Sequence, residues 1–321
     1  MRKIIVGISF LLQLANMAKA QEVNNLLSYK SINADRYYRL NYENDFFSAT
    51  DQYYTQGIHM EVVSPALRKN PLTKLLLHPH YDYIRYGLGA EHDGYTPTSI
   101  GSDQILFGDR PFAGCLYLKS FVIAIDPKKK QRFSAALSTG VIGPGAGAME
   151  MQRDIHKWLN NVTPHGWEYQ VHNDVILNEE LDYEKQLLSY GKYFLLDAEG
   201  MARVGTLSDK AGIGTTLMFG YFYSPYESQP EAKNHFRIYA YEHPEFALIG
   251  YDATLQGGMF NRTSPYTIPS SDISRVVFQN RFGFVVIYQR FHLEYFQSVK
   301  SNEYTTGKMH VWGGVQIAFG F

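Results

Sequence analysis

The sequence predicts an all-β fold, a transmembrane antiparallel β-barrel of about twelve strands. Apolar and polar residues alternate with a period of two in many segments, as they do when one face of a strand contacts lipid and the other lines a lumen. After residue 20, the chain has no apolar run of about 18 residues that could form a membrane helix. Charged residues make up only 19% of the chain, which also contains 25 Tyr and 20 Phe. Aromatic residues in this abundance suit the interfacial girdles of such a barrel.

Residues 1–20 are predicted to be a secretory signal. A positively charged start precedes an apolar stretch at residues 4–14, and the Ala-Lys-Ala sequence at residues 18–20 provides a cleavage site. An uncleaved anchor is the alternative, but the apolar stretch is shorter than the roughly 20 residues of a spanning helix. We therefore expect an exported protein in which residues 21–321 form a single outer-membrane barrel domain.

The last segment of the chain shows the clearest strand pattern. Across residues 309–321, Val311 and Ile317 belong to one phase, and Gln316 belongs to the other. The alternation is about twice as long as a usual soluble strand. It ends on the aromatic Phe321, as expected for the closing strand of a bacterial outer-membrane barrel.

Similar segments recur along the rest of the chain. Near the start, for example, Tyr38 and Leu40 alternate with Arg39 and Asn41. Pro244 could divide the ninth segment, but bacterial single-chain barrels have even strand numbers, so we keep it as one strand. A soluble periplasmic β-sandwich is the alternative fold. The predicted strands are residues 36–46, 54–64, 82–92, 112–125, 131–142, 167–182, 190–205, 212–225, 234–254, 273–287, 289–300 and 304–321.

Charge and cysteine content exclude two kinds of site. The formal net charge is -1, so the chain lacks the positive field that favours nucleic-acid binding. Cys115 is the only cysteine, which excludes an intrachain disulfide and a metal site built from several thiolates. We therefore expect no nucleic-acid partner, and we expect a monomer surrounded by outer-membrane lipids.

Two connections between strands depart from the barrel pattern. Residues 147–160 follow a Gly-Pro-Gly break and place apolar residues at helical spacing, which predicts a short helix on the extracellular side. The connection at residues 64–81 is predicted to be periplasmic, where turns are normally short. Residues 72–77, between Pro71 and Pro79, could form a second short helix there.

Strand parity brings several polar residues to one rim of the barrel. With a periplasmic N-terminus, the connections after the first, third and fifth strands are all extracellular. Asp45 and Thr55 fall in the lumen-facing phase of their strands, and Gln152 and His156 share one helix face at a spacing of four residues. These residues together predict a polar pocket at the outer mouth. Individually, an Asp in a hairpin is also a common turn former, and a helical His is often a surface residue.

Four motifs, most of them in the first half of the chain, carry a family resemblance. They are Asn44-Asp45, DQYYTQG at residues 51–57, Gly108-Asp109-Arg110, and VIGPGAGAMEMQRDIH at residues 141–156, of which the last is the most specific. With these motifs, the sequence resembles the lipid A 3'-O-deacylases of Gram-negative outer membranes, the LpxR type. The resemblance implies a twelve-stranded barrel, dependence on calcium (Ca2+), and hydrolysis of the 3'-acyloxyacyl ester of lipid A, the membrane anchor of lipopolysaccharide, in the outer leaflet.

The resemblance also assigns roles to individual residues. It implies a catalytic site made of His156, Gln152, Thr55, Asn44 and Asp45. In this site a neutral His156 would take a proton from water, and Asp45 would offer the hard oxygen that calcium prefers. Thr55 would donate a hydrogen bond to the oxyanion, and Gln152 would orient the water or the imidazole.

Other assignments stay open at this point. Arg110 and Lys157 are candidate contacts to the phosphates of lipid A, although Arg110 beside Asp109 is equally a candidate for a structural loop pair. An outer-membrane phospholipase or an esterase with a Ser-His nucleophile is the alternative enzyme. A non-catalytic structural or channel barrel is the alternative outside enzymes, although simple porins usually need more strands to leave an aqueous pore.

Overall fold

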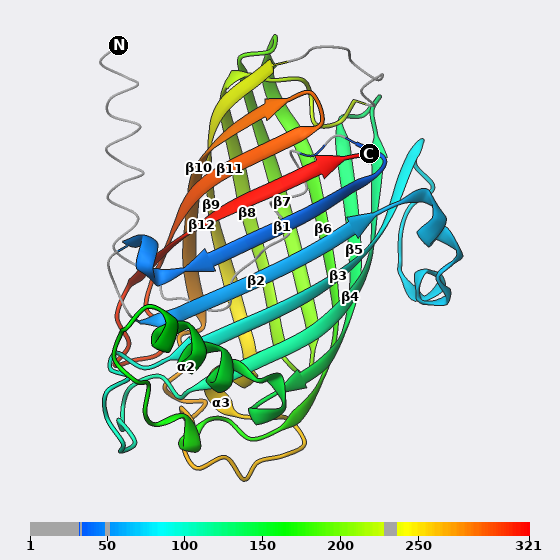
Figure 1. Cartoon of the computed structure of the whole chain (residues 1–321). Coiled ribbons are helices and arrows are strands. Elements are labelled where there is room, and N and C mark those ends of the chain that lie inside the picture. Colours follow the sequence, from blue (N-terminus) through cyan, green and yellow to red (C-terminus); the bar gives the residue numbers. More distant parts are fainter. Residues whose placement is uncertain (1–31, 33, 49–51, 228–235) are drawn as a thin grey trace.

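Twelve antiparallel strands close into a barrel in the computed structural model, which describes residue 32 and residues 34–48, 52–227 and 236–321. Each strand pairs with its neighbours in sequence, and β1 closes the barrel by pairing with β12 (Figure 1). The predicted twelve-stranded barrel is therefore confirmed. The predicted signal at residues 1–20 lies outside the described residues. Within the described ranges, no helix has both the length and the apolar character needed to cross a membrane.

The strand bounds follow the predicted alternation except at a few ends. β9 runs through Pro244 without a break, so the ninth segment is one strand. The predicted sixth strand begins too early, because Trp167–Tyr169 forms a 3-10 turn and β6 starts only at Asp174. The strands are β1 (Tyr37–Asn44), β2 (Tyr53–Val63), β3 (Tyr83–Thr96), β4 (Ala113–Asp126), β5 (Gln131–Ile142), β6 (Asp174–Tyr190), β7 (Phe194–Gly205), β8 (Ser208–Tyr221), β9 (Phe236–Asp252), β10 (Val276–Tyr288), β11 (Phe291–Lys300) and β12 (His310–Gly320).

Short helices occupy the connections between strands. The helix predicted near residues 147–160 is confirmed as α2, and it lies at the same end of the barrel as α3 (Figure 1). The predicted turn of helix near residues 72–77 is a 3-10 helix, η4, at the other end. The helical elements are η2 (Asp45–Ser48), η3 (Pro65–Lys69), η4 (Pro71–Leu75), η5 (Pro144–Ala146), α2 (Ala148–Trp158), η6 (Trp167–Tyr169) and α3 (Ala253–Gln256).

The strands separate a polar interior from an apolar exterior. In β1, Arg39, Asn41 and Glu43 are buried, whereas Tyr38 and Leu40 are 59% and 45% exposed on the outer surface. Charges in the interior need partners, because removing an unpaired charge from water is very unfavourable. Buried ion pairs in the lumen join Arg39 to Glu61, Lys119 to Glu91, Arg132 to Glu184 and Arg203 to Glu180.

The lengths of the connections distinguish the two ends of the barrel. At the end where β12 finishes, the connections at residues 127–130, 191–193 and 289–290 are short, and the connection at residues 64–82 is a long exception. The longest connection, residues 143–173, lies at the opposite end and contains α2. Outer-membrane barrels have short periplasmic turns and longer extracellular loops. We therefore call the α2 end the outer end and the other the periplasmic end.

Candidate active site

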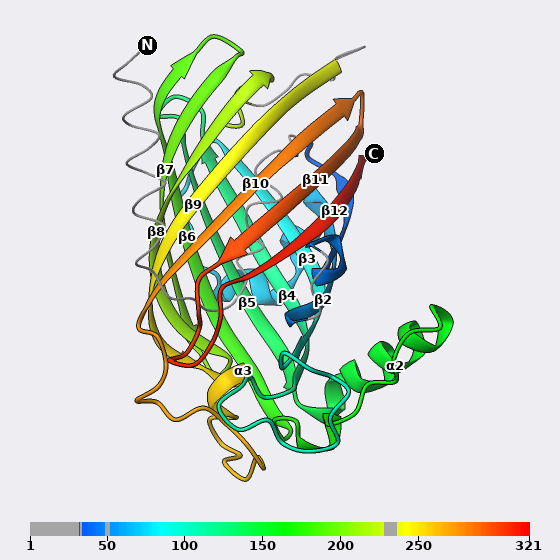
Figure 2. The same cartoon turned by 90° about the vertical axis from the view of Figure 1, so that its left-hand side faces the viewer.

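The outer face of the barrel wall is covered by protein near α2. In the middle of the wall, the outward-facing Met60, Leu116 and Leu118 are 56%, 41% and 62% exposed. Toward the outer end, residues in the same outward phase are buried, and Gln56 and His92 are only 2% and 6% exposed. Helix α2 and the 3-10 turn before it cover this part of the wall, and α2 then projects away from the barrel (Figure 2).

Small residues allow this covering segment to lie against the strands. The His92 imidazole is hydrogen bonded to the carbonyl oxygen of Ala146 at 3.0 Å. A Cβ atom added to Gly114 in β4 would lie 2.6 Å from the Cβ atom of Ala148, the first residue of α2. Non-bonded carbon atoms are normally about 3.5–4.0 Å apart. Any side chain at position 114 would therefore push α2 away from the wall.

A bulge in β2 turns Thr55 toward this helix. The register of β2 on β3 shifts between Tyr54 and Gln56, and the Tyr54 hydroxyl donates to Asp93 Oδ1 in the lumen at 2.7 Å. Thr55 is the extra residue, and its Oγ1 accepts a hydrogen bond from Gln152 Nε2 at 3.4 Å. The predicted lumen-facing phase of Thr55 is therefore wrong, because a bulge interrupts the alternation on which that phase depends.

Hydrogen bonds connect Thr55 to two other predicted site residues. Gln152 is 2% exposed, and its Oε1 accepts a hydrogen bond from Trp167 Nε1 at 2.6 Å. Asn44 Nδ2 donates to the Thr55 carbonyl oxygen at 2.6 Å. The structure thus brings Asn44, Thr55 and Gln152 together beneath α2. Trp167 was not predicted as a site residue, because it falls at the start of the segment predicted as the sixth strand, residues 167–182.

His156 lies one helical turn beyond Gln152 on α2 and is partly exposed. Its Nδ1 is 2.6 Å from the carbonyl oxygen of Val162. A carbonyl oxygen only accepts hydrogen bonds, so this contact places the proton of the neutral imidazole on Nδ1. The Nε2 atom is then the basic nitrogen of the ring.

Asp45 occupies the start of η2, directly after Asn44. Its side chain is 3% exposed, and the Asn44 Oδ1 atom accepts from the Phe46 backbone nitrogen at 2.7 Å, which holds the turn. Ser48 Oγ in the same turn is buried and has no hydrogen-bond partner among the described residues. A carboxylate and a buried hydroxyl are oxygen donors of the kind that calcium takes. The turn therefore supplies two of the roughly six to eight oxygen ligands that calcium takes, and their chemistry is compatible with the implied ion.

The two predicted phosphate contacts have very different surroundings. Lys157 is exposed on α2, next to His156. Arg110 is 1% exposed, forms an ion pair with Glu303, and donates to Thr254 Oγ1 at 2.7 Å. A lipid phosphate could reach Arg110 only if these contacts opened.

Asp109 is held by hydrogen bonds of its own rather than by the Arg110 side chain. Its Oδ1 accepts from the Tyr304 hydroxyl at 3.0 Å, and its Oδ2 accepts from the Thr98 backbone nitrogen at 2.9 Å. Burial raises the pKa of Tyr304, which keeps this hydroxyl protonated as a donor. The Gly-Asp-Arg motif therefore joins three connections at the outer end, residues 97–112, 253–275 and 301–309.

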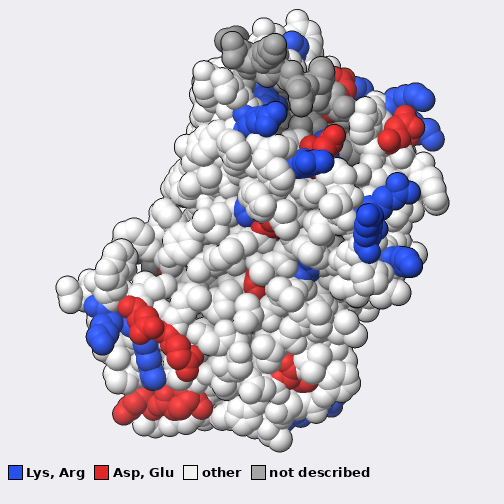
Figure 3. Space-filling view, turned by 45° about the vertical axis from the view of Figure 1, so that its right-hand side comes forward, with Lys and Arg blue, Asp and Glu red and all other residues white. Residues whose placement is uncertain are grey.

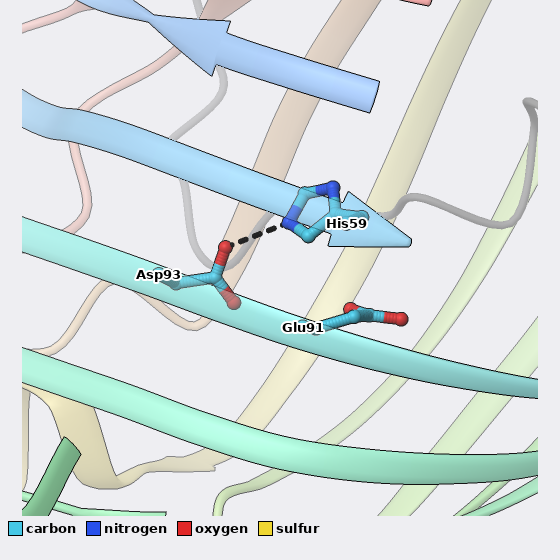
Figure 4. A group of neighbouring side chains, drawn as sticks. All are labelled: His59, Glu91 and Asp93. Carbon is cyan, nitrogen blue, oxygen red and sulfur yellow. Dashed lines mark hydrogen bonds and ion pairs between the residues drawn. The ribbon is translucent and has the colours of Figure 1, made fainter. Parts of the chain in front are cut away.

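A second polar cluster, which the sequence analysis did not identify, lies in the lumen. His59 Nε2 is 2.9 Å from Asp93 Oδ1 (Figure 4). Glu91 accepts from the Tyr117 hydroxyl at 2.7 Å and lies 2.5 Å from the Lys119 ammonium group. Ligand atoms of His59, Glu91 and Asp93 lie within 4.8 Å of one another, as in a metal site. The hydrogen bonds and the lysine already satisfy these groups, so we interpret the cluster as a structural network.

A further group with metal-like spacing consists of Glu199, His243 and Glu245, which are also buried in the wall facing the lumen. Neither group includes Asp45. The calcium ligand predicted from the sequence thus lies apart from both, on the outer-end turn that carries Asn44.

Comparisons with known proteins agree with the fold and show the family. The model of a protein family described as outer membrane protein LpxR matches residues 5–321. The solved structure of LpxR from Salmonella typhimurium superposes with a TM-score of 0.72 at 18% identity, covering 89% of this chain and 100% of that chain. The β domain of the Bordetella autotransporter Brka superposes with a TM-score of only 0.45 at 8% identity, covering 90% of this chain and 100% of that chain. No curated protein sequence matches the chain.

The family match spans nearly the whole chain, including the strand ends and the helix that hold Asn44, Thr55, Gln152 and His156. The twelve strands of the closed barrel lie within the same part of the chain. This chain belongs to the LpxR family of outer-membrane proteins.

Proposed function

We propose that this protein is a calcium-dependent lipid A deacylase that acts as a monomer and hydrolyses the 3'-acyloxyacyl ester in the outer leaflet. Family membership supports this activity. The observation that carries the proposal is the position of the Asn44, Thr55 and Gln152 unit on the outside of the wall. Thr55 and Gln152 are only 4% and 2% exposed where α2 covers them, so a lipid of the outer leaflet would reach them from the lipid side, at the edge of α2, without entering the lumen.

The end of α2 has the surface expected for contact with lipid. Trp158, Leu159 and Val162 are 82%, 57% and 59% exposed. We call these three residues the apolar patch, and they lie at or just after the end of α2, the helix that projects from the barrel (Figure 2). Trp is favoured where protein meets the membrane interface. The patch would hold the helix, and His156 with it, at the level of the lipid A ester.

His156 is the proposed general base. Because Nδ1–H donates to Val162, Nε2 can accept a proton from water as the water oxygen attacks the ester carbonyl. The same nitrogen then returns that proton to the leaving 3'-oxygen of the sugar. The acyl C–O bond breaks, and the products are a free carboxylic acid and a sugar hydroxyl.

Thr55 and Asp45 complete the proposed mechanism. Thr55 Oγ1 accepts a hydrogen bond from Gln152, so its own proton is available to stabilise the oxyanion of the tetrahedral intermediate. Asp45 and Ser48 would hold calcium, which when bound supplies Lewis-acid polarisation of the ester. Lys157 is the proposed phosphate contact, since its ammonium group is exposed beside His156.

The lumen offers little support for the channel alternative. Several of its charged side chains are buried in ion pairs that join neighbouring strands, including Arg39 with Glu61 and Arg132 with Glu184. A conducting pore needs water-exposed polar groups along its length. The enzyme proposal therefore explains more of the structure.

Mass spectrometry of lipid A and phospholipids from cells with and without the protein tests the proposal. We expect loss of the 3' acyl group from lipid A only when the protein is present, and the His156→Ala variant should lose at least about a hundredfold in rate. His165→Ala, in the same connection, is the matched control and should remain active. Cleavage of phospholipids instead would support the phospholipase. Unchanged deacylation by His156→Ala would reject the histidine base.

A further inference from the structure

The connection between β2 and β3 folds into two short 3-10 helices on the outside of the barrel. We call residues 64–77 the arm. The Ser64 and Asn70 side chains cap its two 3-10 helices by accepting hydrogen bonds from backbone nitrogens two residues ahead, at 3.4 and 3.1 Å. Each helix also begins with a proline, which presets the backbone angle. The arm therefore has a defined shape and presents its side chains in fixed directions.

The arm lies against the face of the wall that would otherwise contact lipid. In β4 the outward-facing Leu116 and Leu118 are 41% and 62% exposed, but Ser120, Val122 and Ala124 in the same phase are at most 2% exposed. The change occurs where the arm covers the strand near the periplasmic end (Figure 1).

Specific contacts hold the arm in place. Leu76 packs against Val122 of β4 and Ala135 of β5. Asn70 Nδ2 donates to Ser120 Oγ at 3.1 Å. The arm therefore belongs to the lipid-facing surface of the barrel and is not a loop extending into the periplasm.

The other side of the arm is apolar and exposed. Leu72, Leu75 and Leu77 are 38%, 65% and 60% exposed. These leucines belong to the arm, which contacts β4 at Ser120, two residues beyond the exposed Leu118, so the same lipid layer would meet both. Apolar side chains that project beside a membrane-spanning wall are expected to enter the membrane.

The charges of the arm all have one sign. The arm, residues 64–77, contains Arg68, Lys69 and Lys74, which are all exposed, and it contains no acidic residue. Figure 3 shows Lys and Arg side chains gathered on this side of the molecule. Nearby in the β4–β5 turn, Lys128 is 3.6 Å from Asp82. The positive arm is complementary to anionic lipid headgroups.

We propose that the arm is an anchor to the periplasmic leaflet of the outer membrane. Leu72, Leu75 and Leu77 enter the acyl region at its edge, while Arg68, Lys69 and Lys74 contact phosphates of anionic phospholipids such as phosphatidylglycerol. The inference rests on the outer-membrane barrel and is independent of the deacylase activity proposed above.

A fluorescent label on the arm tests its immersion in lipid. The full-length protein carrying Cys115→Ala and Leu75→Cys would be labelled with an environment-sensitive dye and reconstituted into vesicles of phosphatidylcholine and phosphatidylglycerol. Leu118→Cys on the lipid-facing wall is the positive control, and Lys129→Cys at the tip of the β4–β5 turn is the aqueous control. We expect spin-labelled lipid to quench the labels at 75 and 118 at least twofold more than the label at 129.

Two outcomes would overturn the anchor. The first is quenching of the label at 75 by aqueous iodide to the same extent as at 129, with no quenching by spin-labelled lipid. The second is protection from both quenchers, which would mean that protein covers the arm. A second comparison tests the phosphate contacts. We expect the label at 75 to be quenched more by spin-labelled lipid in vesicles that contain phosphatidylglycerol than in vesicles of phosphatidylcholine alone. In the variant Arg68→Gln, Lys69→Gln, Lys74→Gln, this gain in quenching should disappear. Persistence of that gain would reject the phosphate contacts, and Lys128→Gln, outside the arm, should retain the gain.

Discussion

Trp167 fixes the orientation of Gln152, because the indole Nε1 donates to Gln152 Oε1 at 2.6 Å and so directs the amide nitrogen toward Thr55. An isolated glutamine amide could present either end to its neighbour. The indole removes that freedom, because it can only donate. A residue in a loop thus determines which atom of the helix faces the proposed oxyanion site.

Replacing Trp167 by Phe tests this relationship. The variant leaves Gln152 Oε1 without its donor, so we expect about 1–3 kcal/mol lower stability. Misplacement of Thr55 should also lower kcat for lipid A by roughly ten- to a hundredfold, with a smaller change in KM. Trp158→Phe is the control, since Trp158 is exposed at the end of α2 and phenylalanine keeps the apolar contact with lipid that is proposed for it. Equal kcat in the two variants would show that the indole hydrogen bond has no role in the site.

Deacylase activity should also depend on the close contact between α2 and β4. In Gly114→Ala the new methyl group would lie 2.6 Å from Ala148 Cβ, which forces α2 outward. We expect kcat to fall by about tenfold or more, because small displacements of reacting groups have large effects. The folded barrel should persist, as judged by its heat-modifiable migration in detergent gels.

Gly101→Ala is the matched control for this glycine. Among the described residues, no heavy atom lies within 4 Å of the added Cβ atom. The control should therefore keep parental activity. Full activity of Gly114→Ala would mean that the enzyme tolerates a displaced α2 and does not need the close packing of this helix against β4.

Asp45 should determine the calcium requirement. Asp45→Asn removes the carboxylate charge from the outer-end turn, and we expect the calcium concentration for half-maximal activity to rise by about tenfold or more. Excess chelator should abolish deacylation by the parent protein and leave the barrel folded. Asp103→Asn, in an exposed part of the β3–β4 connection, should behave as the parent does. Activity that persists in chelator would remove calcium from the mechanism.

Arg110 and Lys157 should respond in opposite ways. Arg110→Gln breaks the buried pair with Glu303, so we expect a loss of about 3–5 kcal/mol in stability, seen as a lower thermal midpoint, with KM for lipid A little changed. Lys157→Gln should raise KM several-fold and leave the thermal midpoint unchanged, because its ammonium group is exposed. A raised KM without loss of stability in Arg110→Gln would show that Arg110 contacts the lipid phosphate.

The alternation of residues was enough to predict the barrel and the phase of most strands. In β1, for example, the polar phase of Arg39 and Asn41 is buried and the phase of Tyr38 and Leu40 is exposed, as expected. This succeeds because the side-chain direction of a strand has a period of two and the two environments differ sharply in polarity. The helical spacing in residues 147–160 was likewise sufficient to locate α2.

The sequence motifs predicted which residues belong to the candidate site but not how those residues are arranged. Asn44, Thr55 and Gln152 do meet, but the sequence could not show that they meet outside the wall. The bulge at Thr55 depends on how β2 pairs with β3, which is a contact between segments far apart in sequence. The partner of Arg110 was missed for the same reason, since Glu303 lies in a connection near the other end of the chain.

The sequence by itself determined that this chain forms a lipid-facing barrel with twelve strands, because local alternation records which environment each side chain meets. Only the tertiary structure decided where α2 and the arm lie. Both cover outward-facing wall residues, such as His92 beneath the α2 segment and Val122 beneath the arm. Their docking depends on close packing and hydrogen bonds between distant segments, and no periodicity within one segment records such contacts.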